Sequence, residues 1–126
     1  MTMNDWKVLL VDDEEDFVTT LAERMELRGI KAEVAFNGLE ALEKIDAMKP
    51  ELVVLDLLMP GMIGLDVLRH IATNRPQTAV IVLTGHGSCD FKDEAFRLGA
   101  FECLLKPIDI DVLINKMTTA LASLRS

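Results

Sequence analysis

Five polar side chains follow short apolar runs of this sequence, and their types suit chemistry on a phosphoryl group. Asp12 and Asp13 follow the run VLLV, and Asp56 follows LVVL. Thr84 follows AVIVL, and Lys106 follows FECLL. A short apolar run rich in Val and Leu is typical of a strand that is buried on both faces. The five side chains are therefore predicted to stand at the ends of strands.

The acids and the lysine of this set are chemically complementary. Three carboxylates near one point repel each other and need a cation or a proton at neutral pH. Mg²⁺ suits hard oxygen ligands and keeps several waters, whereas zinc is disfavoured because no His or Cys accompanies the acids. A phosphoryl group would find positive charge at the metal and at Lys106, and a hydroxyl donor at Thr84. One carboxylate would then be the nucleophile, as in aspartyl-phosphate chemistry.

The rest of the chain must place these residues side by side. Apolar runs and helical periodicity alternate along it, separated by turn signals such as Asn37-Gly38. The predicted strands are Lys7–Val11, Lys31–Phe36, Leu52–Leu55, Thr78–Leu83 and Phe101–Leu105. The predicted helices are Glu14–Arg28, Leu39–Met48, Gly64–Asn74, Ser88–Leu98 and Asp109–Leu124. This alternation indicates one α/β domain over residues 1–126 with a parallel sheet, whose strand carboxyl ends share one edge.

Composition limits the classes of function. The net charge of −8 argues against direct binding of nucleic acid or of an anionic membrane by this chain. We recognise no signal peptide and no apolar run of membrane-spanning length, and expect a cytoplasmic protein. Cys89 and Cys103 match neither a disulfide framework nor a metal-ligand spacing and are expected to be reduced. Glu14, Glu15 and Asp16 are expected only to offset the dipole of a helix N-terminus.

The set of polar residues resembles that of the receiver domain of two-component response regulators. The resemblance covers essentially the whole chain, from the VDD motif that ends at Asp13 to the KP motif that begins at Lys106. It implies a flavodoxin-like, doubly wound fold, in which a five-stranded parallel sheet of order 2-1-3-4-5 is flanked by five helices.

The resemblance also implies roles for the acids. Asp56 would be the phosphoacceptor. Asp13, Asp56 and the backbone carbonyl of Leu58 would hold Mg²⁺ directly, and Asp12 would act mainly through metal-bound water. Thr84 would be the switch hydroxyl.

On the last strand, the resemblance makes Lys106 the phosphate-binding lysine, followed by a cis bond to Pro107. Two positions depart from the family pattern. Cys103 stands where Tyr or Phe is usual, and Ile63 stands where an acid often precedes the glycine that opens the third helix. Because Cys103 is too small to act as a switching aromatic, we expect the switch to run through Thr84 and the helix predicted over Ser88–Leu98.

The function implied is that of a phosphorylation-driven switch. A sensor histidine kinase or a phosphotransfer protein would donate a phosphoryl group to Asp56, and the added charge would bias two conformations. An output partner would bind the face formed by the fourth helix, the fifth strand and the fifth helix, and phosphorylation could also produce a homodimer. The domain would not be an enzyme beyond its own Mg²⁺-dependent phosphorylation and dephosphorylation.

Two other functions use the same sheet edge. A flavodoxin-like module would bind a flavin there, but this edge is acidic and lacks a loop that cradles phosphate. A phosphatase of the haloacid dehalogenase type would also use an Asp nucleophile. It normally needs a second acid two residues after the first, where this chain has Leu58.

Overall fold

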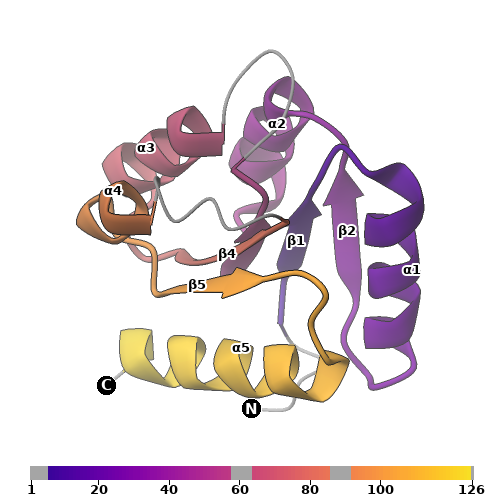
Figure 1. Ribbon diagram of the computed structural model, residues 1–126. Coiled ribbons are helices and arrows are strands. Elements are labelled where there is room, and N and C mark those ends of the chain that lie inside the picture. Colours follow the sequence, from indigo (N-terminus) through magenta and orange to yellow (C-terminus); the bar gives the residue numbers. More distant parts are fainter. Residues whose placement is uncertain (1–5, 58–63, 86–91, 126) are drawn as a thin grey trace.

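The computed structural model describes residues 6–57, 64–85 and 92–125. In these ranges five parallel strands form one sheet in the order β2-β1-β3-β4-β5, as predicted (Figure 1). The strands are β1 (Val8–Val11), β2 (Ala32–Ala35), β3 (Leu52–Leu55), β4 (Ala79–Thr84) and β5 (Glu102–Leu105). The helices are α1 (Glu15–Glu26), α2 (Gly38–Met48), α3 (Gly64–Asn74), α4 (Lys92–Arg97) and α5 (Ile110–Arg125). None of these described helices is long and apolar enough to span a membrane.

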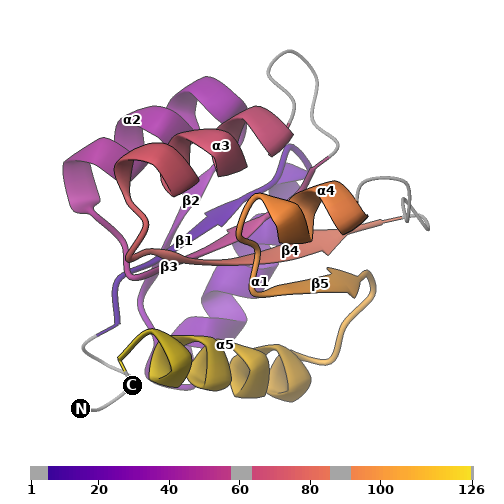
Figure 2. The same ribbon diagram turned by 90° about the vertical axis from the view of Figure 1, so that its left-hand side faces the viewer.

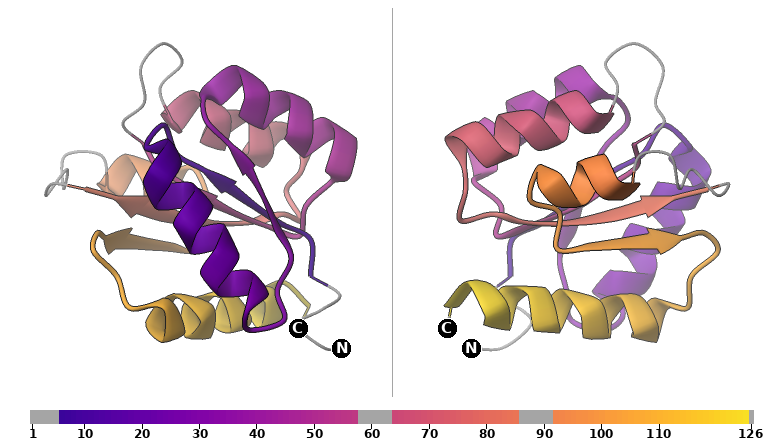
Figure 3. Two further views of the ribbon diagram at one scale, coloured as in Figure 1. Left: turned by 90° about the vertical axis from the view of Figure 1, so that its right-hand side faces the viewer. Right: turned by 60° about the vertical axis from the view of Figure 1, so that its left-hand side comes forward.

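An apolar layer on each face of the sheet holds the helices in place. The helices α1 and α5 cover one face, and α2, α3 and α4 cover the other (Figure 2; Figure 3). Successive residues of a strand point to opposite faces. In β1, Val8 and Leu10 pack in the layer with α1 and α5, whereas Leu9 and Val11 pack in the other. This double burial explains why the central strands are uninterrupted apolar runs.

The predicted helices differ from the observed ones mainly at their ends. The helix α1 ends at Glu26 rather than Arg28, because the next residues form a turn that closes with Gly29 at φ 82°. Glycine adopts this left-handed conformation without the steric cost that a Cβ brings. Ser88, the predicted start of the fourth helix, lies outside the described residues, and α4 is described from Lys92.

The Asn37-Gly38 pair, predicted only as a turn signal, caps the N-terminus of α2. The Asn37 side-chain oxygen accepts a hydrogen bond from the Glu40 N–H at 2.8 Å. The Glu40 carboxylate in turn accepts one from the Phe36 N–H at 2.6 Å. These bonds satisfy amide groups that lack partners within the helix, and α2 accordingly begins at Gly38, one residue earlier than predicted.

The start of α3 lies against the backbone that leaves β3. The Gly64 N–H donates to the Leu57 carbonyl oxygen at 3.0 Å. A Cβ at position 64 would lie 2.4 Å from the Leu57 Cα and 2.5 Å from the Asp56 carbonyl oxygen. Backbone atoms cannot approach a methyl group so closely, so only glycine fits this position. The contact holds the peptide unit that follows Asp56.

We expect Gly64→Ala to lower the free energy of unfolding by about 1–3 kcal/mol, the cost of forcing extra volume into a packed site. Helix propensity alone would favour alanine by about 1 kcal/mol, so a net loss would show that the steric clash wins. Urea unfolding measures the difference. The matched control is Gly85→Ala, since a Cβ there would meet only the Lys106 Cδ, at 3.8 Å. Equal stability of the two variants would contradict the clash.

Candidate functional site

The register of the sheet brings two acids level with each other. Val11 of β1 pairs with Leu55 of β3, so the next residues, Asp12 and Asp56, leave adjacent strands at the same height. The Asp56 N–H continues the ladder by donating to the Val11 carbonyl oxygen at 3.0 Å. The Asp12 and Asp56 side chains are 5% and 6% exposed. Both carboxylates are therefore held in place by the strands and largely removed from water.

Asp13 joins these two acids in one cluster. One carboxylate oxygen from each of Asp12, Asp13 and Asp56 lies within 4.8 Å of the others. Asp13 is exposed, so the cluster has one side open to solvent. Three carboxylates this close repel each other, and their oxygens are suitable ligands for a hard cation that would offset this repulsion.

Lys106, the residue after β5, places its ammonium group among the acids. Its Nζ lies 2.6 Å from the Asp12 Oδ2 and 3.5 Å from the Asp56 Oδ2. It also lies 2.6 Å from the Glu14 Oε1. The Lys106 N–H donates to the Thr84 carbonyl oxygen at 2.8 Å, which anchors the start of the side chain to β4. The lysine is thus attached to the sheet at one end and paired with three acids at the other.

The charge distribution shifts two pKa values. Burial raises the pKa of Asp12, although hydrogen bonds from Lys106 and from the Glu14 N–H act in the opposite direction. For Lys106, burial favours a lower pKa, but the hydrogen bonds with Asp12 and Glu14 outweigh it and raise the pKa above the usual value. Lys106 therefore stays charged at neutral pH. For Asp12, burial makes the charged form less favourable.

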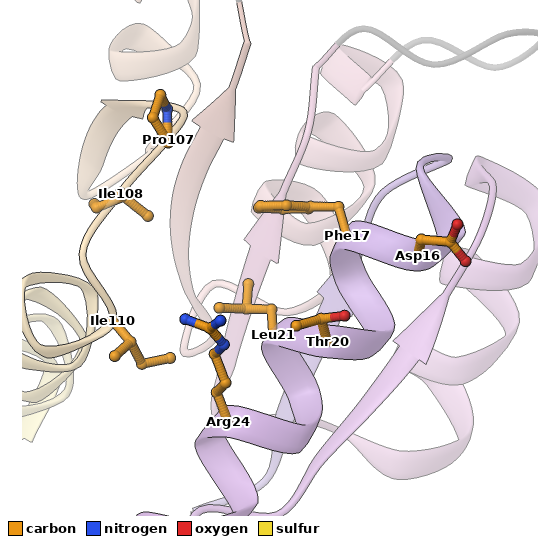
Figure 4. Close-up of a pocket in the computed structure, with 8 residues that line it drawn as sticks. All are labelled: Asp16, Phe17, Thr20, Leu21, Arg24, Pro107, Ile108 and Ile110. Carbon is orange, nitrogen blue, oxygen red and sulfur yellow. The ribbon is translucent and has the colours of Figure 1, made fainter.

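Phe17 of α1 separates this cluster from a neighbouring groove. Its ring centroid lies 4.5 Å from the Lys106 Nζ, a distance at which the ring face attracts the ammonium group. Figure 4 shows Phe17 extending from α1 toward the segment after β5, across a groove of about 440 Å³. Leu21 and Ile108 contribute to its apolar wall, and Arg24 lies at the end of the groove away from Pro107.

The other predicted site residues have separate positions. Thr84 is buried at the end of β4, and its hydroxyl donates to the Gly85 carbonyl oxygen at 3.3 Å. Cys103 lies in β5, half-buried in the layer that contains α2, α3 and α4. The peptide bond between Lys106 and Pro107 is cis, as the resemblance implies. Leu58 lies outside the described residues.

Three residues contribute to the site in ways that the sequence patterns did not indicate. Glu14 was predicted to lie on the first helical turn and only to offset the helix dipole. It precedes α1 instead and pairs with Lys106. Gly64 holds the peptide after Asp56, and Phe17 covers Lys106. No pattern in the sequence linked these three residues to the lysine or to Asp56.

We expect Asp12→Asn to change how stability depends on pH when Mg²⁺ is absent. The folded protein holds a proton on Asp12 more tightly than the unfolded chain does, because the pKa of Asp12 is raised in the folded protein from its ordinary value of 3.8. The resulting stabilisation is fully present below that value and is lost as pH rises through the raised pKa. The free energy of unfolding of the wild type should therefore fall, relative to that of Asp12→Asn, as the pH rises above about 4. Urea midpoints with a chelator present measure this. A wild type that becomes more stable relative to Asp12→Asn as the pH rises would contradict it.

The chain matches the family model described as response regulator receiver domain over residues 8–118. It is 37% identical over 109 residues to sporulation initiation phosphotransferase F of Bacillus subtilis, covering 86% of this chain and 87% of that protein. It is 36% identical over 118 residues to the transcriptional regulatory protein ZraR of Klebsiella oxytoca, covering 94% of this chain and 27% of that protein.

The solved structures agree with these matches. The crystal structure of the receiver domain of NtrX from Brucella abortus has a TM-score of 0.85 at 33% identity, covering 91% of this chain and 98% of that one. The chain spans only 23% to 57% of the length of ZraR and four other curated relatives. Fold, family model and relatives agree, and the chain belongs to the response regulator receiver domain family.

Proposed function

We propose that Asp56 of this receiver domain accepts a phosphoryl group, in a site formed by Asp12, Asp13, Thr84 and Lys106. The observation that carries the proposal is the cluster of three carboxylates within 4.8 Å, with the Lys106 ammonium 3.5 Å from Asp56. The two buried acids need compensation for their charge, and the exposed Asp13 leaves the cluster open to a ligand. Such a site suits an anion that arrives together with a cation.

The donor set fits Mg²⁺. Asp13 and Asp56 would hold it directly with the Leu58 carbonyl, whereas Asp12, already 2.6 Å from Lys106, would act through bound water. When bound, the ion supplies positive charge to the oxygens of the phosphoryl group. Family membership favours this use of the edge over the flavin-binding and phosphatase alternatives.

The proposed reaction is an in-line displacement. A carboxylate oxygen of Asp56 forms a bond to phosphorus while the bond from phosphorus to the donor breaks. With acetyl phosphate, acetate leaves with the electron pair of that bond; with a phosphohistidine donor, the imidazole nitrogen keeps it. Lys106 donates to an equatorial oxygen of the transferred group, and the Thr84 hydroxyl donates to another once it leaves the Gly85 carbonyl.

The proposed partners are a histidine kinase or phosphotransfer protein as donor, and an output partner on the face of α4, β5 and α5. Large apolar side chains are exposed on each of these elements: Phe96 at 39%, Leu105 at 54% and Val112 at 46%. Exposed apolar side chains on adjoining elements are typical of a surface that binds another protein. A second copy of this chain is one partner that this face could bind, and the two copies would then form a homodimer on phosphorylation.

Acetyl phosphate with Mg²⁺ should add one phosphoryl group to the wild-type chain and none to Asp56→Asn. Intact mass measures the addition, and a chelator should abolish it because the transferred group then lacks the cation. Asp93→Asn, which alters an exposed acid of α4, is the matched control and should still be labelled. Equal labelling of the wild type and Asp56→Asn would show that another residue accepts the group.

Thr84→Ala should reduce the conformational response to beryllium fluoride and Mg²⁺, because it removes the hydroxyl that would bind the phosphoryl group. Cys103→Ala should leave that response nearly intact, since it removes only one sulfur from a half-buried position. Chemical-shift changes in α4 report both. Loss of the response in Cys103→Ala and its retention in Thr84→Ala would reverse the proposed roles.

A further inference from the structure

The ammonium group of Lys106 already has as many acidic partners as it has hydrogens. A lysine ammonium donates at most three hydrogen bonds. Asp12 and Glu14 each place an oxygen 2.6 Å from the Nζ, and Asp56 places one at 3.5 Å. The Phe17 ring covers a further side of the same group. A phosphoryl group on Asp56 can therefore use this lysine only by weakening one of the existing contacts.

The three acids differ in how easily they can leave. The Asp12 and Asp56 side chains are 5% and 6% exposed, and both residues follow strands of the sheet. The Asp12 carboxylate also accepts the Glu14 N–H at 2.9 Å, which fixes it further. The Glu14 side chain is 63% exposed and can turn into water. Glu14 is therefore the partner that costs least to displace.

We propose that Glu14 competes with the phosphoryl group for Lys106 and thereby limits the phosphorylation of this domain. In the unphosphorylated state, the Glu14 carboxylate satisfies the lysine. When the phosphoryl group arrives, it adds negative charge beside Asp56 and repels the nearby Glu14. The pairing of Glu14 with Lys106 and the repulsion between Glu14 and the phosphoryl group both favour the unphosphorylated state. Glu14 acts through Lys106, so it is a positioning residue. This inference rests on the proposed role of Asp56.

The competition predicts that Glu14→Gln is phosphorylated faster than the wild type. At saturating Mg²⁺, the rate with acetyl phosphate and the affinity for beryllium fluoride should both rise about twofold to fivefold, the range that an exposed ion pair produces. Glu14→Ala removes the side chain beyond Cβ and should also raise the phosphorylation rate and the affinity for beryllium fluoride. Urea unfolding verifies that each variant is folded.

Glu15→Gln is the matched control, because it removes the same charge from the adjacent exposed position on α1. A general electrostatic effect on the anionic donor would raise the rate in both variants, whereas competition for Lys106 raises it only at position 14. The ratio of the Glu14→Gln rate to the wild-type rate should also approach one as ionic strength rises, since salt screens an exposed pair.

The outcomes separate this inference from the proposed function. If the wild type takes up no phosphoryl group, the proposed role of Asp56 is wrong, and the proposed competition by Glu14 is wrong as well. If the wild type is labelled but Glu14→Gln and Glu15→Gln behave alike, only the role of Glu14 is overturned. A slower rate or weaker beryllium fluoride binding in Glu14→Gln would also overturn it, because it would show that Glu14 assists the reaction.

Discussion

The excess of negative charge at the carboxyl edge of the sheet is the constraint on which the rest of the site depends. Asp12, Asp13 and Asp56 converge there, and the described residues oppose them with the single ammonium group of Lys106. The raised pKa of Asp12 shows that burial outweighs the pairing with the lysine. A bound cation would relieve this repulsion. A phosphoryl group on Asp56, as proposed, would add more negative charge, which a bound cation would also offset.

Burial of the sheet on both faces allows this arrangement of charge to persist. The acids follow strands whose residues are packed into one or the other apolar layer, so the backbone positions of Asp12 and Asp56 cannot separate without disturbing the core. Gly64 adds a local restraint, because α3 lies against the peptide unit after Asp56. Stability supplied by the apolar layers thus offsets the cost of holding like charges together, which is a common relation between a fold and its functional site.

Local patterns in the sequence were sufficient to predict the strands and the polar residues at their ends, whereas the strand order was predicted only from the resemblance to receiver domains. An apolar run followed by Asp56 is visible without coordinates. The pairing of Glu14 with Lys106 is not, since the two residues are far apart in sequence and Glu14 also fits the acidic start of a helix. The need for glycine at position 64 depends on a distance between α3 and the backbone after β3, which no periodicity encodes.

The hydrogen-bond ladder offers a route from the site to the surface that requires no aromatic residue at position 103. Thr84 pairs in register with Leu105 of β5, and its carbonyl oxygen accepts the Lys106 N–H at 2.8 Å. Leu105 is 54% exposed on β5, the edge strand of the sheet between α4 and α5. A displacement of Thr84 toward a phosphoryl group would therefore act on β5 through the backbone. Because that backbone carries Leu105, the position of an exposed apolar side chain would follow the state of the site.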